Sequence, residues 1–494
     1  MHGTTPAAGG NGSQARPWNS LSAVVSPVAG YQVDGVNAPL LSTVPYNHFN
    51  PATKTTEYWT NGTGQPIEPG DEILLMSGNY GNISISLYGH EIANSAFVTV
   101  AAAAGQTPVL STLFVGSTTN WVFEGLKVQS LRTSSNTNPL IYVRNQGASL
   151  PTANIVFENM TVSSTNNAAA WSQAEWVANA RSGFFAIHNA GGTDAKCISF
   201  TGSHISNVRF GASLTANQLV FSNNQIDHFG DDGIDYAASD LVITKNSIHD
   251  NLYIGDGNHE DAMQGQIGVL PAGATVNYFQ NVLIDSNMVI RQTDPKLAFP
   301  SYLQGIDAFD EEWTNVTVTN NVVITSACWG IAFSSIHSSL IANNTVVADG
   351  LIPTAGGCPP AVSVGDKTHE GSSSSNTVVR NNLASEITVY NLDTGVEADH
   401  NVGMLRMGPA LSWYVNGVPK YYSKAGPYAN GNIIDSGGPT SEFVDFDPSR
   451  LTYNVMLKYG AQAICAGTAG PPTVDILGVA RAPQHTAGAY SYPK

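Results

Sequence analysis

Short stretches in which apolar and polar residues alternate recur along this chain, and each stretch ends in a turn that contains asparagine. One of them is Val316-Thr317-Val318-Thr319-Asn320-Asn321, in which every second side chain faces the same side of a β-strand. The final asparagines of seven such stretches are Asn159, Asn224, Asn246, Asn287, Asn321, Asn344 and Asn382. The closest of them are 22 and 23 residues apart, and the longer intervals fit the same unit with loop insertions.

A repeat of about 22 residues with three short strands is typical of a parallel β-helix. Asparagine suits the turns of this fold because it tolerates left-handed backbone angles and because its amide can bond the asparagine one coil away. A β-propeller needs blades of roughly 40–50 residues joined by hairpins, so the short spacing argues against it. The sequence therefore predicts an all-β, single-domain solenoid.

The repeat changes what the length of the chain implies. A chain of 494 residues would ordinarily form several domains, whereas a solenoid grows by adding coils. We expect a flexible N-terminal segment over residues 1–30 and a β-helix with an N-terminal cap and a groove over residues 31–384. Residues 385–494 are expected to form C-terminal coils and a less regular extension of the same domain.

Composition and charge exclude several classes of protein. Charged residues make up 12% of the chain, too few for a long coiled coil, and 42% hydrophobic residues can bury a core, which argues against disorder. The net charge of −17 without basic clusters argues against a nucleic-acid partner. No apolar run is long enough to span a membrane. A polyanionic ligand would be repelled unless a cation intervened.

Segments near both ends resemble a known superfamily. Pro69-Gly70-Asp71-Glu72-Ile73-Leu74-Leu75 resembles the first coils of alginate lyases and chondroitinase B, and Gly488-Ala489-Tyr490 resembles the last coil of many bacterial members. The chain is similar over about residues 30–490 to the right-handed parallel β-helix superfamily of pectate lyase-like carbohydrate enzymes. This resemblance implies a right-handed helix and a polysaccharide or oligosaccharide partner, and it leaves the reaction open because one fold carries many chemistries.

Aligning successive coils on a small-apolar pair places polar residues in two columns. The residues before the pair are Asp232, Asp261, Gln304 and Trp329, and the residues after it are Asp235, Gln264, Asp307 and Ala332. Because equivalent residues of adjacent coils lie about 4.8 Å apart, Asp232 should neighbour Asp261, and Asp235 and Asp307 should lie about 10 Å apart. Adjacent like charges repel, which favours a functional interpretation of these columns.

The candidate site is built from these columns and the loops beside them. The candidate catalytic residues are Asp232, Asp235, His259, Glu260, Asp261 and Asp307. The candidate substrate-binding residues, which are amides or aromatic rings able to stack on sugars, are Tyr253, Gln264, Tyr302, Gln304, Phe309, Trp313 and Trp329.

Two carboxyl groups in a sugar-sized groove favour glycoside hydrolysis, which requires no cofactor. A wide separation of the two carboxyl groups, as expected for Asp235 and Asp307, predicts inversion of the anomeric configuration. A close separation, as expected for Asp232 and Asp261, predicts its retention. We therefore expect an enzyme that cleaves polysaccharides, and we narrowly favour hydrolysis over elimination as the reaction.

The main alternative is a calcium-assisted lyase acting by β-elimination on a uronic-acid polymer such as alginate or pectate. Asp231-Asp232-Gly233-Ile234-Asp235 is similar to a calcium-binding run of family 9 pectate lyases, which implies Ca²⁺ at Asp231, Asp232, Asp235 and Asp261. A C5-epimerase and a glycan-binding tailspike or adhesin remain further alternatives.

The cysteines test the alignment independently. Cys328 and Cys358 precede the same strand in consecutive coils, at a separation that suits a disulfide, whereas Cys197 and Cys465 are too far apart to pair and are expected in the core. A disulfide favours a secreted or periplasmic protein. The N-terminus has no apolar signal core, and the sequence leaves the oligomeric state open.

Overall fold

The computed structural model describes most of the chain as short parallel strands. It describes residues 21–25, 32–33, 36–37, 46–50, 55–59, 69–85, 92–145, 151–188, 195–266, 277–350, 359–365, 372–390, 395–404, 411–415, 418–421, 430–482 and 485–492. The chain divides into two compact units, the first formed by residues 1–168 and 178–224 and the second by residues 169–177 and 225–494. Each unit is described by itself below.

The first unit is built from three parallel sheets that the chain visits in turn, one strand of each per coil. One sheet contains β5 (Glu72–Leu75), β8 (Ile92–Ala102), β11 (Thr118–Glu124), β14 (Ala153–Glu158), β17 (Lys196–Thr201) and β20 (Asn217–Ser222). The next contains β6 (Gly78–Asn79), β9 (Pro108–Leu110), β12 (Lys127–Gln129), β15 (Thr161–Ser163) and β18 (His204–Val208). The third contains β7 (Asn82–Ile85), β10 (Thr112–Val115), β13 (Ile141–Arg144), β16 (Phe184–Ile187) and β19 (Ala212–Leu214).

The N-terminal part of the chain contributes a few small elements. These are α1 (Leu21–Val25) and the antiparallel pairs β1 (Gln32–Val33) with β2 (Val36–Asn37) and β3 (Tyr46–Asn50) with β4 (Thr55–Trp59). A further helix, α2 (Gln173–Asn179), interrupts the coils, and its Gln173 donates a hydrogen bond to the backbone oxygen of Tyr253 at 2.8 Å.

The second unit repeats the three-sheet coil. One sheet contains β21 (Gln225–Phe229), β24 (Ser247–Asn251), β27 (Met288–Ile290), β30 (Val322–Thr325), β34 (Thr345–Ala348), β37 (Leu383–Ala384), β40 (Val402–Gly403) and β43 (Ile433–Ile434). The next contains β23 (Leu241–Thr244), β26 (Tyr278–Asp285), β29 (Glu312–Thr319), β33 (Leu340–Ala342), β36 (Val378–Arg380) and β39 (Glu397–Asp399), with β32 (Ile336–His337) also paired to β29.

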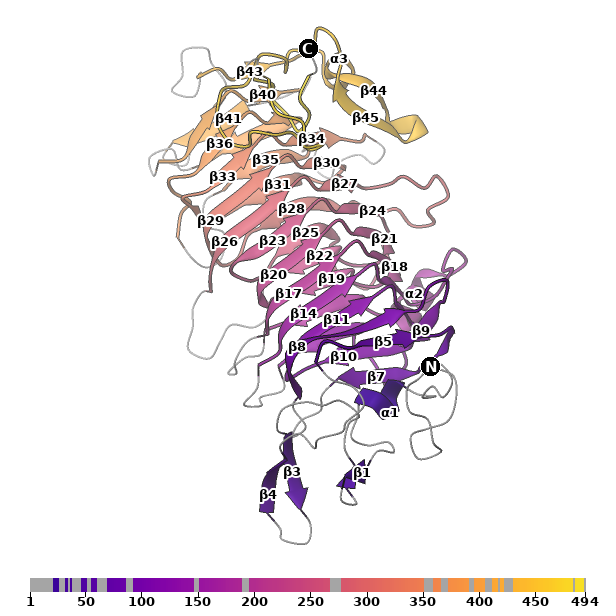
Figure 1. The fold of residues 1–494 in the computed structure, drawn as a ribbon. Helices are drawn as coiled ribbons and strands as arrows, with labels where there is room; N and C mark the ends of the chain where they lie inside the picture. The colour runs from indigo at the N-terminus through magenta and orange to yellow at the C-terminus, as the bar shows by residue number, and fades with distance from the viewer. Residues whose placement is uncertain are drawn as a thin grey trace. The chain divides into compact units, whose positions relative to one another are not determined.

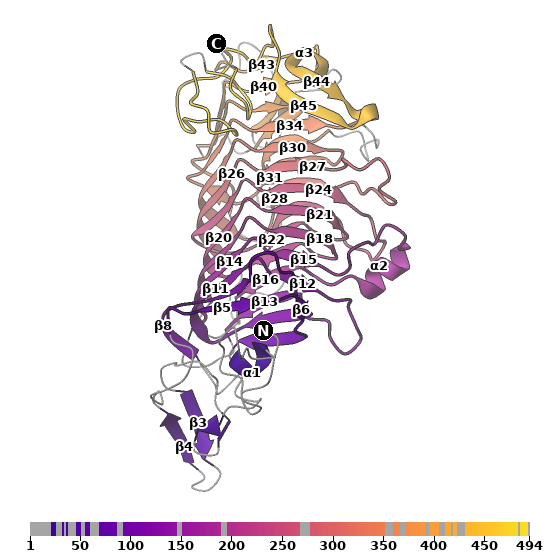
Figure 2. The ribbon, with the colours of Figure 1, turned by 45° about the vertical axis from the view of Figure 1, so that its right-hand side comes forward.

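The remaining parallel sheet of the second unit is called the site sheet. It contains β22 (Ile234–Tyr236), β25 (Asp261–Gly265), β28 (Gln304–Ala308), β31 (Trp329–Phe333), β35 (Ala361–Val364), β38 (Glu386–Val389) and β41 (Leu411–Val415), with β42 (Val418–Tyr421) added antiparallel to β41. Figure 1 shows these strands rising in order from β22 to β41, and Figure 2 shows β21 to β43 stacked in the same way.

The C-terminal part is less regular, although parallel strands continue to β43. It adds α3 (Pro439–Glu442), the short 3-10 helix η4 (Pro448–Arg450) and the antiparallel pair β44 (Phe443–Asp447) and β45 (Thr452–Leu457). Phe443, Val455 and Leu457 of this pair pack in a hydrophobic cluster with Leu383 and Val402 of the coils. The parallel strands, three to a coil, confirm the prediction of an all-β, right-handed parallel β-helix.

The asparagines of the second unit form the ladder that the sequence predicts. Two neighbouring residues of each turn have different roles in it. The first residue of each turn takes the left-handed conformation, with φ of 56° at Asn320 and 56° at Asn343. The second residue carries the ladder: the Asn321 Nδ2 donates to Asn344 Oδ1 at 3.0 Å, and Asn344 Nδ2 donates to Asn382 Oδ1 at 3.0 Å. The same bonds link the whole series Asn246, Asn287, Asn321, Asn344, Asn382, Asn401 and Asn432.

Candidate functional site

The strand register confirms the two columns of polar residues on the site sheet. Ile234 pairs with Met263, which pairs with Ile306, and all three side chains are buried in the core. Their neighbours then pair in the order predicted, with Asp235 opposite Gln264, which is itself opposite Asp307. Asp261 lies opposite Gln304. Side chains alternate between the two faces of a strand, so an apolar column in the core requires the polar columns on the outer face.

Asp232 and Asp235 form the first pair of carboxyl groups. Burial raises the pKa of Asp232 to about 6, and burial together with the nearby Asp232 raises the pKa of Asp235 well above its usual value. The two side chains lie within hydrogen-bonding reach of each other. Asp232 Oδ1 also accepts the backbone N–H of Asp261 at 2.9 Å, and Asn258 Nδ2 lies 3.3 Å from both Asp232 oxygens. Sequence reasoning missed Asn258, although its place in the loop before β25 could have identified it.

Asp261 and Asp307 form the second pair. Both residues are fully buried, and burial raises the pKa of Asp307 to about 7 and that of Asp261 well above its usual value. The charge of Asp307 contributes to the raised pKa of Asp261, and among the described residues the side-chain oxygens of both have no hydrogen-bond partner. Because like charges so close together disfavour ionisation, the cluster holds fewer negative charges than four separate carboxylates would.

The observed pairs differ from the pairs that backbone stacking predicted. The sequence suggested a close pair of Asp232 with Asp261 and a wide pair of Asp235 with Asp307, and the structure joins Asp232 with Asp235 and Asp261 with Asp307. Asp232 turns toward the backbone N–H of Asp261 instead of toward its carboxyl group. The side-chain torsions thus decide the pairing, and strand register alone does not fix them.

His259 lies at the exposed edge of these carboxyl groups. Its side chain is 60% exposed, and its Nε2 lies 3.3 Å from Asp261 Oδ2 and 3.0 Å from Gln264 Nε2. Gln264 Oε1 in turn accepts a hydrogen bond from Gln266 Nε2. Among the ion pairs of the described residues, His259 is the basic side chain next to this cluster, and neither arginine nor lysine pairs with Asp232, Asp235, Asp261 or Asp307.

Glu260 is also buried in this region. Burial and, after it, the neighbouring charges of Asp231 and Asp232 raise its pKa to about 8. Glu260 therefore carries a proton at neutral pH and cannot serve as a base there. Its role as a candidate catalytic residue stays a prediction.

The predicted calcium ligands do not fit the ion as they are arranged. Among the described residues, no group of three or more His, Cys, Asp or Glu side chains is placed to hold a metal ion. Calcium prefers six to eight oxygen ligands around one point, and the assignment of Ca²⁺ to Asp231, Asp232, Asp235 and Asp261 stays a prediction.

Three aromatic side chains border the site, and one predicted aromatic does not. Tyr253, Tyr302 and Trp329 are 49%, 44% and 41% exposed. Phe309 is half-buried, and its ring lies 5.2 Å from that of Trp329 in an edge-to-face contact. The prediction for Trp313 is wrong, because this side chain is fully buried and packs on Phe279 at 4.9 Å. Its position on β29 turns it into the core.

A second group of His and Asp residues, which sequence reasoning missed, lies on β21 and β24. His228 Nδ1 and His249 Nδ1 each lie 2.7 Å from the neighbouring carboxylate, Asp227 and Asp250 respectively. Burial alone would raise the pKa of Asp250, but hydrogen bonds from His249, Thr293 and the backbone of residue 294 lower it to about 2. Asp250 thus holds the loop after β27 in place.

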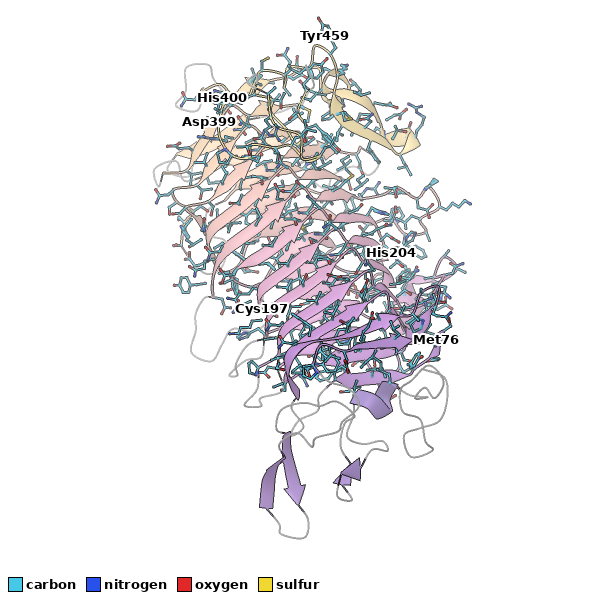
Figure 3. All side chains as sticks on the ribbon, viewed as in Figure 1. Met76, Cys197, His204, Asp399, His400 and Tyr459 are labelled. Atoms are coloured by element: carbon cyan, nitrogen blue, oxygen red, sulfur yellow. The ribbon has the colours of Figure 1, made fainter. Side chains whose placement is uncertain are left out.

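The cysteines support part of the alignment. Cys328 is in a disulfide bond, and its predicted partner Cys358 lies outside the described residues. Cys197 and Cys465 are free, as expected, but the prediction that they belong to the core is wrong because both are exposed. Figure 3 labels Cys197 on the first unit. Within the described residues, no helix is long and apolar enough to cross a membrane.

Comparison with other proteins gives matches to structures alone. The sequence matches no protein family and no curated protein. The pectate lyase Pel9A is 16% identical, with a TM-score of 0.42, over 86% of this chain and 89% of its own. The A-module of the Azotobacter vinelandii mannuronan C-5 epimerase AlgE6 is 16% identical, with a TM-score of 0.46, over 74% of this chain and 89% of its own.

A third match is the Dettilon tailspike protein, which is 13% identical, with a TM-score of 0.31, over 67% of this chain and 58% of its own. The fold of the chain is a right-handed parallel β-helix.

Proposed function

We propose that this protein cleaves a uronic-acid-containing polysaccharide by β-elimination, outside the cytoplasm, with His259 as the base. The observation that carries the proposal is the position of His259, an exposed imidazole whose Nε2 lies 3.3 Å from the buried carboxyl group of Asp261. The disulfide at Cys328 supports a secreted or periplasmic location.

Elimination begins when a base removes the proton from C5, next to the uronate carboxylate. The electrons of that C–H bond form a C4–C5 double bond, the C4–O bond breaks, and the leaving oxygen takes up a proton. His259 takes the C5 proton at Nδ1, while Asp261 and Gln264 orient the ring through Nε2. The half-buried Asp235 holds a proton because its pKa is raised, so it can donate that proton to the leaving oxygen.

The substrate carboxylate must be neutralised for its C5 proton to become acidic. Gln264 and Gln266 supply amide N–H groups beside His259, and the protonated carboxyl groups add further donors. A charge of −17 seemed to disfavour an anionic substrate. Because burial raises the pKa of all four central carboxyl groups, they carry less negative charge than four ionised carboxylates and repel an incoming uronate less.

Hydrolysis, which the sequence placed narrowly ahead, finds less support in this geometry. Glycoside hydrolases keep their two carboxyl groups about 5–9.5 Å apart, so that sugar or water fits between them. Here the four carboxyl groups lie close enough to raise one another's pKa, which differs from one acid and one ionised base held at a set separation.

The test is product analysis with alginate, pectate and an uncharged glucan as substrates. Elimination gives new reducing ends together with the ultraviolet absorbance of the C4–C5 double bond, and it requires the uronate polymer. Reducing ends without this absorbance would instead establish hydrolysis, and an exchanged C5 proton without cleavage would establish epimerisation. Addition of a chelator should leave the rate unchanged, and a chelator-sensitive rate would contradict the metal-independent site.

The variant His259→Ala should lower kcat about 10²–10⁴-fold, the usual contribution of a general base, while the protein stays folded because the side chain is exposed. His204→Ala, which changes a half-buried histidine in the first unit, is the matched control and should keep full activity. Equal activity of the two variants would remove His259 from the mechanism.

A further inference from the structure

Tyr302 and Phe309 flank β28, and Trp329 begins the neighbouring strand β31, so we call these three aromatic residues the platform. Tyr302 and Trp329 are among the most exposed aromatic side chains of the second unit, at 44% and 41%. Phe309 supports Trp329 through an edge contact at 5.2 Å. Exposed aromatic rings that lie together usually mark a binding surface.

The strand register fixes how far the platform lies from the base. Ile306 of β28 pairs with Ile331 of β31, so Gln304 lies opposite Trp329, and Asp261 lies opposite Gln304. Adjacent coils are about 4.8 Å apart, which places the Trp329 backbone about 10 Å from that of Asp261. One sugar residue advances a polysaccharide by roughly one coil, so Trp329 lies about two sugars from the reacting bond.

Gln304, which lies between the base and the platform, has an acceptor, unpaired within the described part of the chain, that a ligand could bind. Gln304 Oε1 is buried and, among the described residues, has no hydrogen-bond donor. A buried acceptor without a donor costs about 1–3 kcal/mol, and a sugar hydroxyl would supply the missing proton. This is a second observation, independent of the aromatic rings, that indicates a bound sugar at this coil.

The platform is held in place by the fold. Cys328, next to Trp329, is in a disulfide bond, and its backbone oxygen accepts the N–H of Ala361 at 3.0 Å. The backbone oxygen of Tyr302 accepts a hydrogen bond from Ser326 Oγ at 3.1 Å. A ring that is already ordered loses little conformational entropy when a sugar stacks on it.

We infer that the polysaccharide runs along the coil axis from β25 toward β31, with one sugar bonded to Gln304 and the next stacked on Trp329. This inference rests on the proposed function and adds the direction of the chain and the minimum length of a good substrate. Stacking uses the apolar C–H face of a sugar ring, so Trp329 binds uronic and neutral sugars alike. The enzyme then requires a chain that extends two sugars beyond the cleaved bond toward β31.

The experiment compares Trp329→Ala with Trp329→Phe on long polymers and on oligosaccharides too short to reach β31. Trp329→Ala should raise KM for the polymer about tenfold and leave kcat and the short substrates unchanged, and Trp329→Phe should restore most of the loss. Tyr278→Ala is the matched control, because Tyr278 is 74% exposed on β26, outside the site sheet, and should change nothing. Equal KM values for wild type and Trp329→Ala would overturn the inference.

A binding measurement separates this inference from the reaction. Affinity electrophoresis in gels containing the polymer is run with His259→Ala and with His259→Ala combined with Trp329→Ala. If the polymer retards His259→Ala but not the double variant, the platform binds the polysaccharide, even if no elimination product is ever found. Equal retardation of both overturns the platform while leaving the proposed reaction intact, and thermal unfolding of each variant confirms that the fold persists.

Discussion

The two units of this protein hold similar coils together by different means. In the first unit, aromatic rings stack in the core from coil to coil, with centroids 5.2 Å apart between Phe123 and Phe157 and 5.4 Å apart between Phe200 and Phe221. In the second unit, aliphatic side chains such as Ile284 of β26 and Val318 of β29 fill the corresponding positions. The asparagine ladder supplies a continuous set of buried hydrogen bonds there.

The two units also differ in the residues that form hydrogen bonds between the turns of successive coils. In the first unit Ser203 Oγ accepts the backbone N–H of Met160, and Asn224 Oδ1 accepts that of Ser203, so serine replaces one rung of the ladder. In the second unit every rung from Asn246 to Asn432 is an asparagine.

The coils that carry the buried carboxyl groups are therefore the coils with the continuous ladder. Burying carboxyl groups costs free energy even when they share protons. The buried carboxyl groups destabilise the site sheet, and the asparagine ladder stabilises the same coils.

The largest expected loss of stability comes from breaking the aromatic stack of the first unit. Phe157 is fully buried and contacts the rings of Phe123, Phe184 and Phe200. Phe157→Ala should lower the free energy of unfolding by about 3–5 kcal/mol, as measured by urea denaturation. Phe185→Ala, at a half-buried position on the other face of β16, is the control and should cost much less. Similar losses for both would show that stacking does not dominate this unit.

The next largest effect should come from removing one rung of the ladder. Asn321 Nδ2 donates to the backbone oxygen of Ile284 at 2.9 Å, and Asn321 Oδ1 accepts from the backbone N–H of Asn287 at 2.9 Å. Asn321→Ala leaves these buried groups without partners and should cost about 2–4 kcal/mol. Asn315→Gly is the control, since it removes an exposed side-chain bond to Asn281 and keeps a residue that accepts a positive φ. A ladder variant as stable as this control would contradict the comparison.

A smaller effect, which depends on pH, should come from the buried acid Glu260. Its pKa is about 8 in the folded protein, against 4.5 for the ordinary side chain. Between these values the folded protein holds a proton that the unfolded chain has released, so the free energy of unfolding falls as the pH rises. Glu260→Gln should therefore gain stability over wild type as the pH is raised from about 4.5 to about 8, and thermal unfolding across this range measures the gain.

In the same unit, Asp250 should make the free energy of unfolding rise with pH, the opposite of the effect of Glu260. Its pKa is lowered to about 2 from 3.8, so its contribution is complete above the unfolded value and is lost as the pH falls through about 2. Asp250→Asn should be less stable than wild type at neutral pH, and the difference should disappear at strongly acidic pH. Parallel pH profiles for the Glu260 and Asp250 variants would contradict the two assignments.

The fold could be predicted from the sequence because a solenoid turns a local repeat into a tertiary contact. The spacing of Asn321 and Asn344 fixes both the coil length and the neighbour of each strand, and the register of Asp235 with Gln264 follows from it. Trp313 was misplaced because an aromatic residue near a loop insertion can face either side of the strand, and its contact with Phe279 is visible only in the folded chain.

The sequence by itself determined the helix, the ladder and the two polar columns, because each depends on backbone spacing that repeats from coil to coil. The tertiary structure alone decided how deeply each carboxyl group is buried, which of them have a raised pKa, and that His259 lies next to Asp261. These features depend on side-chain torsions and on burial, which vary at each position and do not follow the repeat. A fold built on repetition is thus predictable from sequence, while its site depends on the few residues that break the repetition.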